Sequence, residues 1–432
     1  MTDSLLSLQQ RHIASLQAHY ESLMAHFDID AIALYSGHAS AFFADDHYPA
    51  FQAFGHFVHW VPLPHAEHCW LVIAPNAKPT LYLHAPEDFW HLPTQLPDEP
   101  WCDAFDIVRV SDIAPPTVSA NTALVGDINA LSAELRAQLK GVDAPEALYW
   151  ALDEQRMYKS DYEVACLREA NRRALDGHRA AEAAFFGAAS ELDIQLAYLA
   201  ASRQRESQVP YQNIIGLNAH AGVLHYQHYD VQAPRQRHSL LVDAGYRFRG
   251  YAADLTRTYD GPDAPSVFAD LITAVTNIKD TVIDAMAPNV AFLDLHTLMH
   301  RHLAEVLVAH GLFQGSAEQA LEAGVTRAFC PHGLGHSLGI QVHDVAGKRL
   351  ADGTPSPSPS QHPALRLTRT LAPGMVITIE PGCYFIPMLL EPLRQRGLPL
   401  NWALIEELLP CGGIRIEDNV LITPSGRDNL TA

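Results

Sequence analysis

Three histidines and three glycines lie within the thirteen residues HGLGHSLGIQVHD, at positions 332–344. Imidazole carries protons near neutral pH and is a common metal ligand. Because glycine disfavours a helix, we expect this stretch to be a loop that positions His332, His336 and His343. The chain contains 24 histidines, so such a cluster does not define a site by itself. Its chemistry depends on the side chains that the fold brings to it.

Two aspartates lie in the apolar segment LLVDAGYRFRGYAADLTRTY, at positions 240–259. A hairpin that turns at the Phe248–Arg249 junction would place Asp243 and Asp254 directly opposite, with Cβ atoms about 5 Å apart. Two carboxylates so close among apolar neighbours repel each other and lose hydration, so one protonates or a cation lies between them. A pair of turn-capping aspartates is the alternative. Placement in the bodies of strands favours the shared cation.

Two further strand-like stretches carry a carboxylate. MVITIEPG runs from apolar residues into Glu380 before Pro381 and Gly382. In GGIRIEDN, Arg415 and Glu417 are two residues apart and therefore share one face of a strand. Taken singly, these are a solvated strand end and a surface salt bridge.

Taken together with the aspartates, these glutamates indicate a metal site. Four carboxylates and one histidine form an oxygen-rich ligand set, and four negative charges match two divalent cations. Such a set favours Mn²⁺ or a similar ion over a thiolate-bound structural zinc. The helical H-E-x-x-H zinc motif is absent, because Gly333 follows His332.

The elements that position these residues divide the chain at about residue 157. In residues 1–157 a helix is followed by five apolar runs of strand length, which predict a smaller α/β domain: IDAIALYSG, HCWLVIA, PTLYLHA, FDIVRV and TALVGDI. In residues 158–432, Ser160–Glu163 and Ser190–Asp193 are helix-initiating capping patterns. Further helices are expected at about 266–286 and 292–310, strands at SLLVDAG, YAADLTRTY, MVITIEPG and GGIRIEDNVLI, and a loop at 355–363.

Composition bounds the class of protein. The 432 residues are 48% hydrophobic and 18% charged, as in globular proteins. A net charge of −20 argues against nucleic acid and anionic membranes as partners. Six scattered cysteines without a C-x-x-C pair support neither a disulfide framework nor a structural zinc site. With no signal peptide and no apolar run near the ~18 residues of a membrane span, we expect a soluble cytoplasmic protein.

The five candidate ligands in their sequence context resemble the dimetal site of the pita-bread metallopeptidases, which include methionine aminopeptidase, aminopeptidase P and prolidase. LHY (224–226), DAG, GYAADLTRTY, PHGLGHSLGIQVHD, LAPGMVITIEPGCYF and GGIRIEDN look like bacterial Xaa-Pro dipeptidases (prolidases), and SGH, FFADDHYPAF and HCWLVI extend the similarity to the N-terminal part. The resemblance implies an α/β fold: an N-terminal creatinase/prolidase-like α/β domain at 1–157, for dimerisation and cleft closure, then a pita-bread catalytic domain of pseudo-two-fold α+β type at 158–432.

The resemblance also implies the roles of the ligands. Asp243 would chelate one metal ion, His336 and Glu380 the other, and Asp254 and Glu417 would bridge both. Two divalent ions per chain are implied, Mn²⁺ first and Co²⁺ or Zn²⁺ as alternatives, with a water between them that attacks the peptide carbonyl.

Other residues receive catalytic or substrate-binding roles by the same resemblance. Glu380 would shuttle the proton, and Arg415 would orient Glu417. Three histidines would line the cleft and stabilise the oxyanion and the leaving nitrogen: His225, His332 and His343. The expected substrate-binding residues are Tyr211, Tyr384, Arg366 (a clamp for the dipeptide carboxylate), Val342 and Asp46.

The implied activity is hydrolysis of dipeptides with C-terminal proline, in a homodimer whose N-terminal domain helps to wall the neighbouring cleft. Removal of an N-terminal residue before proline from longer peptides, as by aminopeptidase P, is the nearest alternative. Organophosphate hydrolysis is a second alternative, expected as a side activity. A metal-free pita-bread binding module and a metal-free creatine-hydrolase relative are opposed by the intact ligand set.

Overall fold

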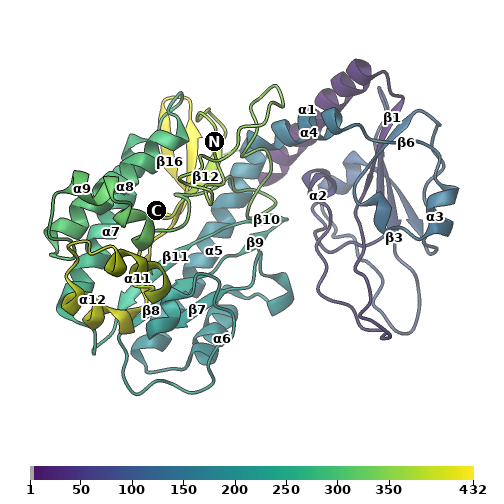
Figure 1. Ribbon diagram of the computed structural model, residues 1–432. Coiled ribbons are helices and arrows are strands. Elements are labelled where there is room, and N and C mark those ends of the chain that lie inside the picture. The colour runs from purple at the N-terminus through teal and green to yellow at the C-terminus, as the bar shows by residue number, and fades with distance from the viewer. Residues whose placement is uncertain (1–3) are drawn as a thin grey trace. The chain divides into compact units, whose positions relative to one another are not determined.

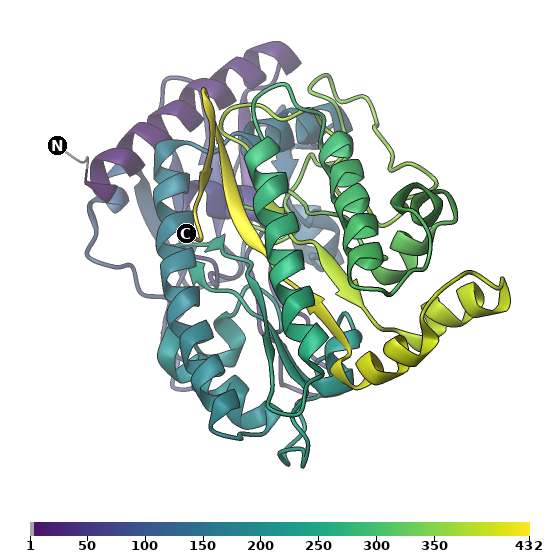
Figure 2. The same cartoon turned by 90° about the vertical axis from the view of Figure 1, so that its left-hand side faces the viewer.

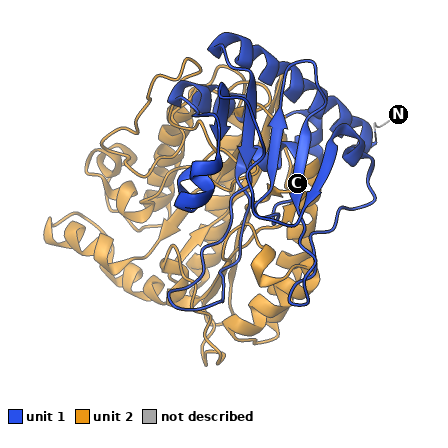
Figure 3. Cartoon of the chain, turned by 90° about the vertical axis from the view of Figure 1, so that its right-hand side faces the viewer, with its two compact units in different colours: residues 1–156, 160–165 blue, residues 157–159, 166–432 orange. Residues whose placement is uncertain are grey.

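The computed structural model describes residues 4–432 and forms two compact units. Unit 1 comprises the chain up to Arg156 together with Ser160–Ala165, and unit 2 comprises Met157–Lys159 and Cys166–Ala432 (Figures 1 and 3). Within residues 4–432, none of the helices combines the length and the apolar character needed to cross a membrane. The six cysteines are free thiols, as expected; the cytoplasmic location stays a prediction.

Unit 1 is a mixed six-stranded sheet with helices. α1 (Leu5–Phe27) begins where the Ser4 side chain accepts a hydrogen bond from the amide of Ser7. The five apolar runs predicted to be strands all form strands of this sheet, whose order is β4-β3-β2-β1-β5-β6. The strands are β1 (Ala31–Tyr35), β2 (Trp70–Ile73), β3 (Thr80–His84), β4 (Asp106–Val110), β5 (Thr122–Val125) and β6 (Val142–Asp143), and the helices are α2 (Gly55–Trp60), α3 (Ala133–Gln138) and α4 (Glu146–Met157).

Helices cover the sheets of unit 2. The predicted capping boxes are present at Ser160 and Ser190, where each serine hydroxyl accepts from the amide three residues on. The two predicted later helices are confirmed as α7 (Ser266–Ala285) and α8 (Phe292–Ala309), which pack side by side (Figure 2). The remaining helices are α5 (Asp161–Phe186), α6 (Glu191–Ser202), α9 (Ala317–Glu322), α10 (Val325–Phe329), α11 (Pro387–Gln395) and α12 (Trp402–Leu408).

Unit 2 contains two three-stranded antiparallel sheets and two ribbons. The first sheet has the order β11-β8-β7 and the second β12-β15-β16, while β9 pairs with β10 and β13 with β14. Phe268, Met299 and Ile377 belong to the apolar core that joins α7 and α8 to the second sheet. The bounds are β7 (Ile214–Leu217), β8 (Ser239–Asp243), β9 (Arg247–Phe248), β10 (Tyr251–Ala252), β11 (Thr256–Asp260), β12 (Val376–Ile379), β13 (Gly382–Tyr384), β14 (Gly413–Arg415), β15 (Asp418–Thr423) and β16 (Gly426–Asn429).

The predicted hairpin register is wrong by two residues. Arg249 and Gly250 form the turn, both with positive φ (51° and 94°), which suits a two-residue hairpin loop. Asp243 therefore pairs with Thr256 rather than with Asp254. Asp254 lies between β10 and β11, where the chain passes from the ribbon to the first sheet, and not in the body of a strand. Since side chains alternate with a period of two, a shift of two residues keeps Asp254 on the predicted face.

Candidate metal centre

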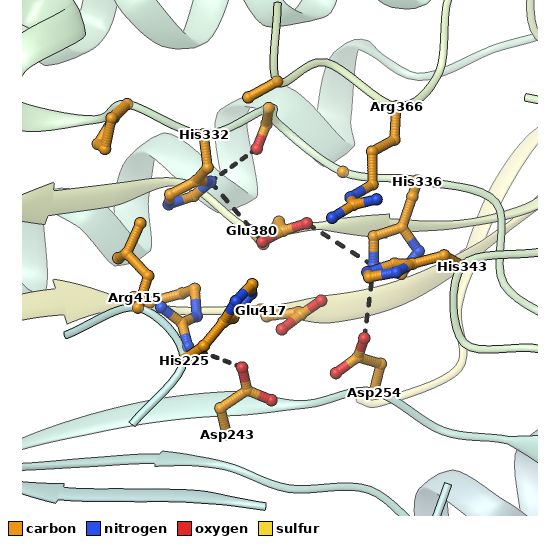
Figure 4. Close-up of a pocket in the computed structure, with 15 residues that line it drawn as sticks. His225, Asp243, Asp254, His332, His336, His343, Arg366, Glu380, Arg415 and Glu417 are labelled. Carbon is orange, nitrogen blue, oxygen red and sulfur yellow. Dashed lines mark hydrogen bonds and ion pairs between the residues drawn. The ribbon is translucent and has the colours of Figure 1, made fainter. Parts of the chain in front are cut away.

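A cavity of about 330 Å³ lies in unit 2, within the size range of small-molecule sites. Four carboxylates and four imidazoles line it (Figure 4). It is bounded by the ends of β8 and β12, by the segments that precede β11 and β15, and by the glycine-rich loop. The lining residues are Leu224, His225, Asp243, Asp254, Pro331, His332, Gly333, Gly335, His336, His343, Ala364, Arg366, Glu380, Arg415 and Glu417.

Asp243 ends β8 with both carboxylate oxygens engaged. The Tyr211 hydroxyl donates to Oδ1 at 2.8 Å, and Nη2 of Arg415 donates to Oδ2 at 2.7 Å. Arg415 is also held by the Tyr384 hydroxyl, 2.8 Å from its Nη1, and by the Thr256 hydroxyl, 3.3 Å from its Nε. A buried guanidinium thus balances one carboxylate, and Asp243 is fixed in orientation before any ligand binds.

His336 and Glu380 are held together by backbone pairing. The amide of Thr378 donates to the carbonyl of His336 at 3.0 Å, and the amide of Glu380 donates to that of Leu334 at 2.8 Å. The loop and β12 approach so closely that a Cβ at Gly335 would lie 1.8 Å from the Thr378 carbonyl oxygen. His336 Nδ1 lies 3.0 Å from the Ser337 carbonyl, which can only accept, so Nδ1 carries the hydrogen. Nε2 is left to face the carboxylates, as in histidine ligands of metals.

The remaining carboxylates complete the cluster around Nε2 of His336. Asp254 Oδ2 lies 3.4 Å from this nitrogen and Glu380 Oε1 lies 3.8 Å from it. One ligand atom from each of Asp254, His336 and Glu417 lies within 4.8 Å of the others. Glu417 is 2% exposed, and the Thr256 hydroxyl donates to its Oε2 at 2.7 Å. These residues come from four segments far apart in the sequence.

The negative charge of these carboxylates favours the binding of cations. Burial, and then the neighbouring Asp254, Glu380 and Asp243, hold the pKa of Glu417 well above its ordinary value. Burial raises the pKa of Glu380 to about 7, against the opposing effects of His336 and Arg415. Four carboxylates and two guanidiniums, those of Arg366 and Arg415, line the cavity, so negative charge remains in excess if all the carboxylates ionise. An oxygen-rich set with one imidazole nitrogen fits divalent ions such as Mn²⁺.

The raised pKa of Glu380 predicts a pH dependence for the metal-free protein. Between the ordinary value of 4.5 and about 7, the folded state holds a proton that the unfolded state has lost, so this group's contribution to stability declines as pH rises through that window. Glu380→Gln needs no such proton. In parallel urea titrations of the metal-free proteins, we expect the free energy of unfolding of Glu380→Gln to rise relative to that of wild type as pH increases from 4.5 to about 7. A constant difference would contradict this.

The predicted cleft histidines line the cavity. His332 Nδ1 lies 2.8 Å from the Gly333 carbonyl and Nε2 lies 2.8 Å from the Tyr384 hydroxyl. Burial, and then Arg415, lowers the pKa of His332 to about 4, so the ring is neutral and the hydroxyl donates to Nε2. The His343 ring meets that of His336 edge-on, with centroids 4.4 Å apart, and burial lowers its pKa to about 4. Both rings are neutral at pH 7.

Comparison with known proteins decides the family. Metallopeptidase family M24 matches residues 165–424, and the Xaa-Pro dipeptidase N-terminal domain matches residues 7–151. The chain belongs to metallopeptidase family M24. It is 48% identical to the Xaa-Pro dipeptidase of Marinobacter nauticus, over 99% of this chain and 98% of that protein. It is 42% identical to the Xaa-Pro dipeptidase of Cronobacter sakazakii, again over 99% of this chain and 98% of that protein.

Solved structures of aminopeptidase P share the fold of this M24 chain. Zinc-substituted aminopeptidase P from E. coli, in complex with product, aligns with a TM-score of 0.75 at 20% identity, over 100% of this chain and 96% of that one. Aminopeptidase PepP from Pseudomonas aeruginosa aligns with a TM-score of 0.71 at 21% identity, over 97% of this chain and 94% of that one. At this identity the similarity concerns the fold, and the predicted α/β unit followed by a pita-bread unit is confirmed.

Some of the predicted site residues of the M24 chain lie elsewhere. Arg415 contacts Asp243 instead of Glu417. Alternation along the strand places Arg415 and Glu417 on one face, but the guanidinium of Arg415 extends toward the end of β8, where Asp243 lies. Tyr384 is fully buried and holds His332 and Arg415 without lining the cavity. Val342 is also absent from the lining residues. Asp46 is exposed in unit 1, and its assignment to the substrate pocket stays a prediction.

Residues that position the carboxylates were missed by the sequence reasoning. The Thr256 hydroxyl contacts both Glu417 and Arg415, and Thr378 Oγ1 accepts from the amide of His336 at 3.1 Å. The Asn419 side chain accepts from the amide of Asp254 at 3.1 Å and donates to its carbonyl. Thr256 and Thr378 lie two residues from Asp254 and Glu380, and Asn419 lies two residues from Glu417. The period of two along a strand is therefore the signal that could have found them.

Proposed function

We propose that this M24 chain is an Xaa-Pro dipeptidase that hydrolyses dipeptides with C-terminal proline. The observation that carries the proposal is the set of four carboxylates and His336 that lines a cavity of about 330 Å³. Full-length similarity to proteins named Xaa-Pro dipeptidase, at 41–48% identity, supports the substrate class. The M24 family supports metal-dependent peptide hydrolysis.

Five residues would hold two divalent ions: Asp243, Asp254, His336, Glu380 and Glu417. When bound, the ions would activate a water molecule and polarise the scissile carbonyl. Manganese is proposed because carboxylate oxygens dominate the donor set. The position of Asp254 and Glu380 beside Nε2 of His336, with Asp243 held apart by Arg415, supports the assignment of His336 and Glu380 to one ion and Asp243 to the other.

The protein's own groups would manage protons and charge. Glu380, with a pKa near neutrality, is suited to accept a proton and deliver it to the leaving nitrogen. His225, His332 and His343 line the cavity and would stabilise the oxyanion and that nitrogen. Arg366 also lines the cavity (Figure 4) and would bind the dipeptide carboxylate.

Metal removal tests the proposal directly. Protein reconstituted with Mn²⁺ should bind about two ions per chain, by the two-metal chemistry of such centres. Chelation should abolish hydrolysis of Xaa-Pro dipeptides, and Mn²⁺ should restore it. Elemental analysis and a panel of Xaa-Pro and Xaa-Pro-Yaa peptides provide the measurements. Full activity in metal-free protein would refute the mechanism, and a preference for Xaa-Pro-Yaa would indicate aminopeptidase P activity instead.

We also propose a homodimer in which unit 1, residues 1–157 by the predicted boundary, closes the neighbouring cleft. Large apolar side chains exposed in unit 1 support an interaction surface: Phe43, Phe89, Trp90 and Leu92 are at least 75% exposed. Sedimentation velocity at micromolar concentration should show the dimer. A fully active monomer would contradict the proposal.

A further inference from the structure

A second cluster of imidazoles lies outside the cavity that the carboxylates form. His296 and His300 are one turn apart on α8 and therefore lie on the same face of that helix. His362 joins them from the loop at 355–363, with its ring centroid 4.3 Å from that of His296 and 5.0 Å from that of His300. One ring nitrogen from each of the three lies within 4.8 Å of the others.

The ring nitrogens of His296 and His300 lack hydrogen-bond partners among the described residues. His296 is fully buried and His300 is 4% exposed, and all four of their ring nitrogens find no hydrogen-bond partner among residues 4–432. Buried polar groups are nearly always paired, and leaving one unpaired costs free energy. The buried His12, by contrast, is paired through both nitrogens, with the Ser160 hydroxyl and the His59 carbonyl. The unpaired nitrogens of α8 indicate a missing ligand.

The charge of the cluster indicates which ligand. Burial lowers the pKa of His296 to about 2 and that of His300 to about 3, so both rings are neutral, the form that binds metal. The neighbouring Arg327 opposes protonation of His300 and His362. Three neutral nitrogens without a carboxylate suit Zn²⁺, Co²⁺, Ni²⁺ or Cu²⁺ better than Mn²⁺ or Mg²⁺.

We propose that His296, His300 and His362 form a third metal site in the chain, which binds a divalent transition ion of the zinc type. Tetrahedral coordination requires nitrogen atoms about 3.3 Å apart, so ion binding would draw the three rings closer from their present separation of up to 4.8 Å. His362 is only partly buried, so the ion can enter from the loop side and keep a water as fourth ligand. The donor set separates this site from the oxygen-rich centre, and the inference does not depend on the peptidase activity.

Occupation of this site would fix a loop that reaches the cavity. Ala364 and Arg366, which line the cavity, follow His362 by two and four residues. An ion that ties His362 to α8 would therefore restrain the segment carrying Arg366. The expected consequence is higher thermal stability and protection of the loop from proteolysis when zinc is bound.

Equilibrium dialysis of the full-length protein against Zn²⁺ tests the proposal. His362→Ala should bind one equivalent fewer than wild type, while His302→Ala should match wild type. His302 is the matched control, because it lies on the same helix but contacts Glu305 at 2.9 Å. Co²⁺ loading provides a second readout, since the visible absorption of tetrahedral cobalt should be reduced in His362→Ala but not in His302→Ala. Ions at the oxygen-rich centre contribute equally to all three proteins, so failure of the proposed function leaves the difference unchanged.

Equal stoichiometry and equal cobalt spectra in wild type and His362→Ala would overturn the proposal. His362 lies in a surface loop, so this variant is expected to fold, and its thermal unfolding without metal should match that of wild type. His300→Gln, which keeps a polar side chain on α8, should also lose the equivalent. The zinc-dependent rise in unfolding temperature should be smaller in both variants than in His302→Ala.

Discussion

Glu380→Gln should lower the turnover of an Xaa-Pro dipeptide by about two to four orders of magnitude. The substitution keeps the size of the side chain and one oxygen but removes the group whose pKa lies near neutrality. Without it, no carboxylate at this position can take up and return a proton. Steady-state kinetics of the Mn²⁺-loaded protein provide the measurement.

Two controls make this result interpretable. Metal content must be measured in the same samples, because Gln is a weaker ligand than Glu. Glu322→Gln, at an exposed position at the end of α9, should retain wild-type turnover. Wild-type turnover in Glu380→Gln with both ions bound would remove Glu380 from the proton transfer.

His336→Ala and His343→Ala should separate metal binding from catalysis. His336 directs Nε2 at Asp254 and Glu380, so its removal should release at least one ion and reduce activity to background. His343 lines the cavity beside the His336 ring. Its removal should leave both ions bound while lowering turnover by about two orders of magnitude or more. Elemental analysis after dialysis, alongside kinetics, measures both effects.

The reverse pattern would exchange the two assignments. Loss of an ion in His343→Ala, together with two retained ions in His336→Ala, would make His343 the ligand. His302→Ala serves as the control for general loss of an imidazole, since His302 lies on α8 and contacts Glu305. It should keep both the ions and the turnover.

Local chemistry made much of this fold predictable. The capping residues at Ser160 and Ser190, and the apolar periodicity of α7 and α8, are properties of neighbouring residues. The four carboxylates that line the cavity could be predicted for a similar reason, since a carboxylate among apolar strand residues is costly unless something neutralises it. The sequence therefore indicated the candidate ligands before their positions were known.

Contacts between distant segments could not be predicted in this way. Arg415 is two residues from Glu417 but bonds to Asp243, which is 172 residues away. His296 and His300 show helical spacing in the sequence, yet nothing in that spacing indicates that His362 packs against them. The register error at Asp254 arose because the turn was placed one residue too early. The alternation of side chains along a strand determines which face of the sheet a residue occupies, but the position of the turn determines its cross-strand partner.

The contact at Gly335 has a consequence for how this chain can vary. A side chain there would overlap the backbone of Thr378, and backbone cannot move aside as a flexible side chain can. In a library that samples all residues at position 335, selection for activity should recover glycine alone, although this residue carries no reactive group. Attempts to change the metal preference should therefore vary the donor atoms themselves and leave the backbone beneath His336 intact.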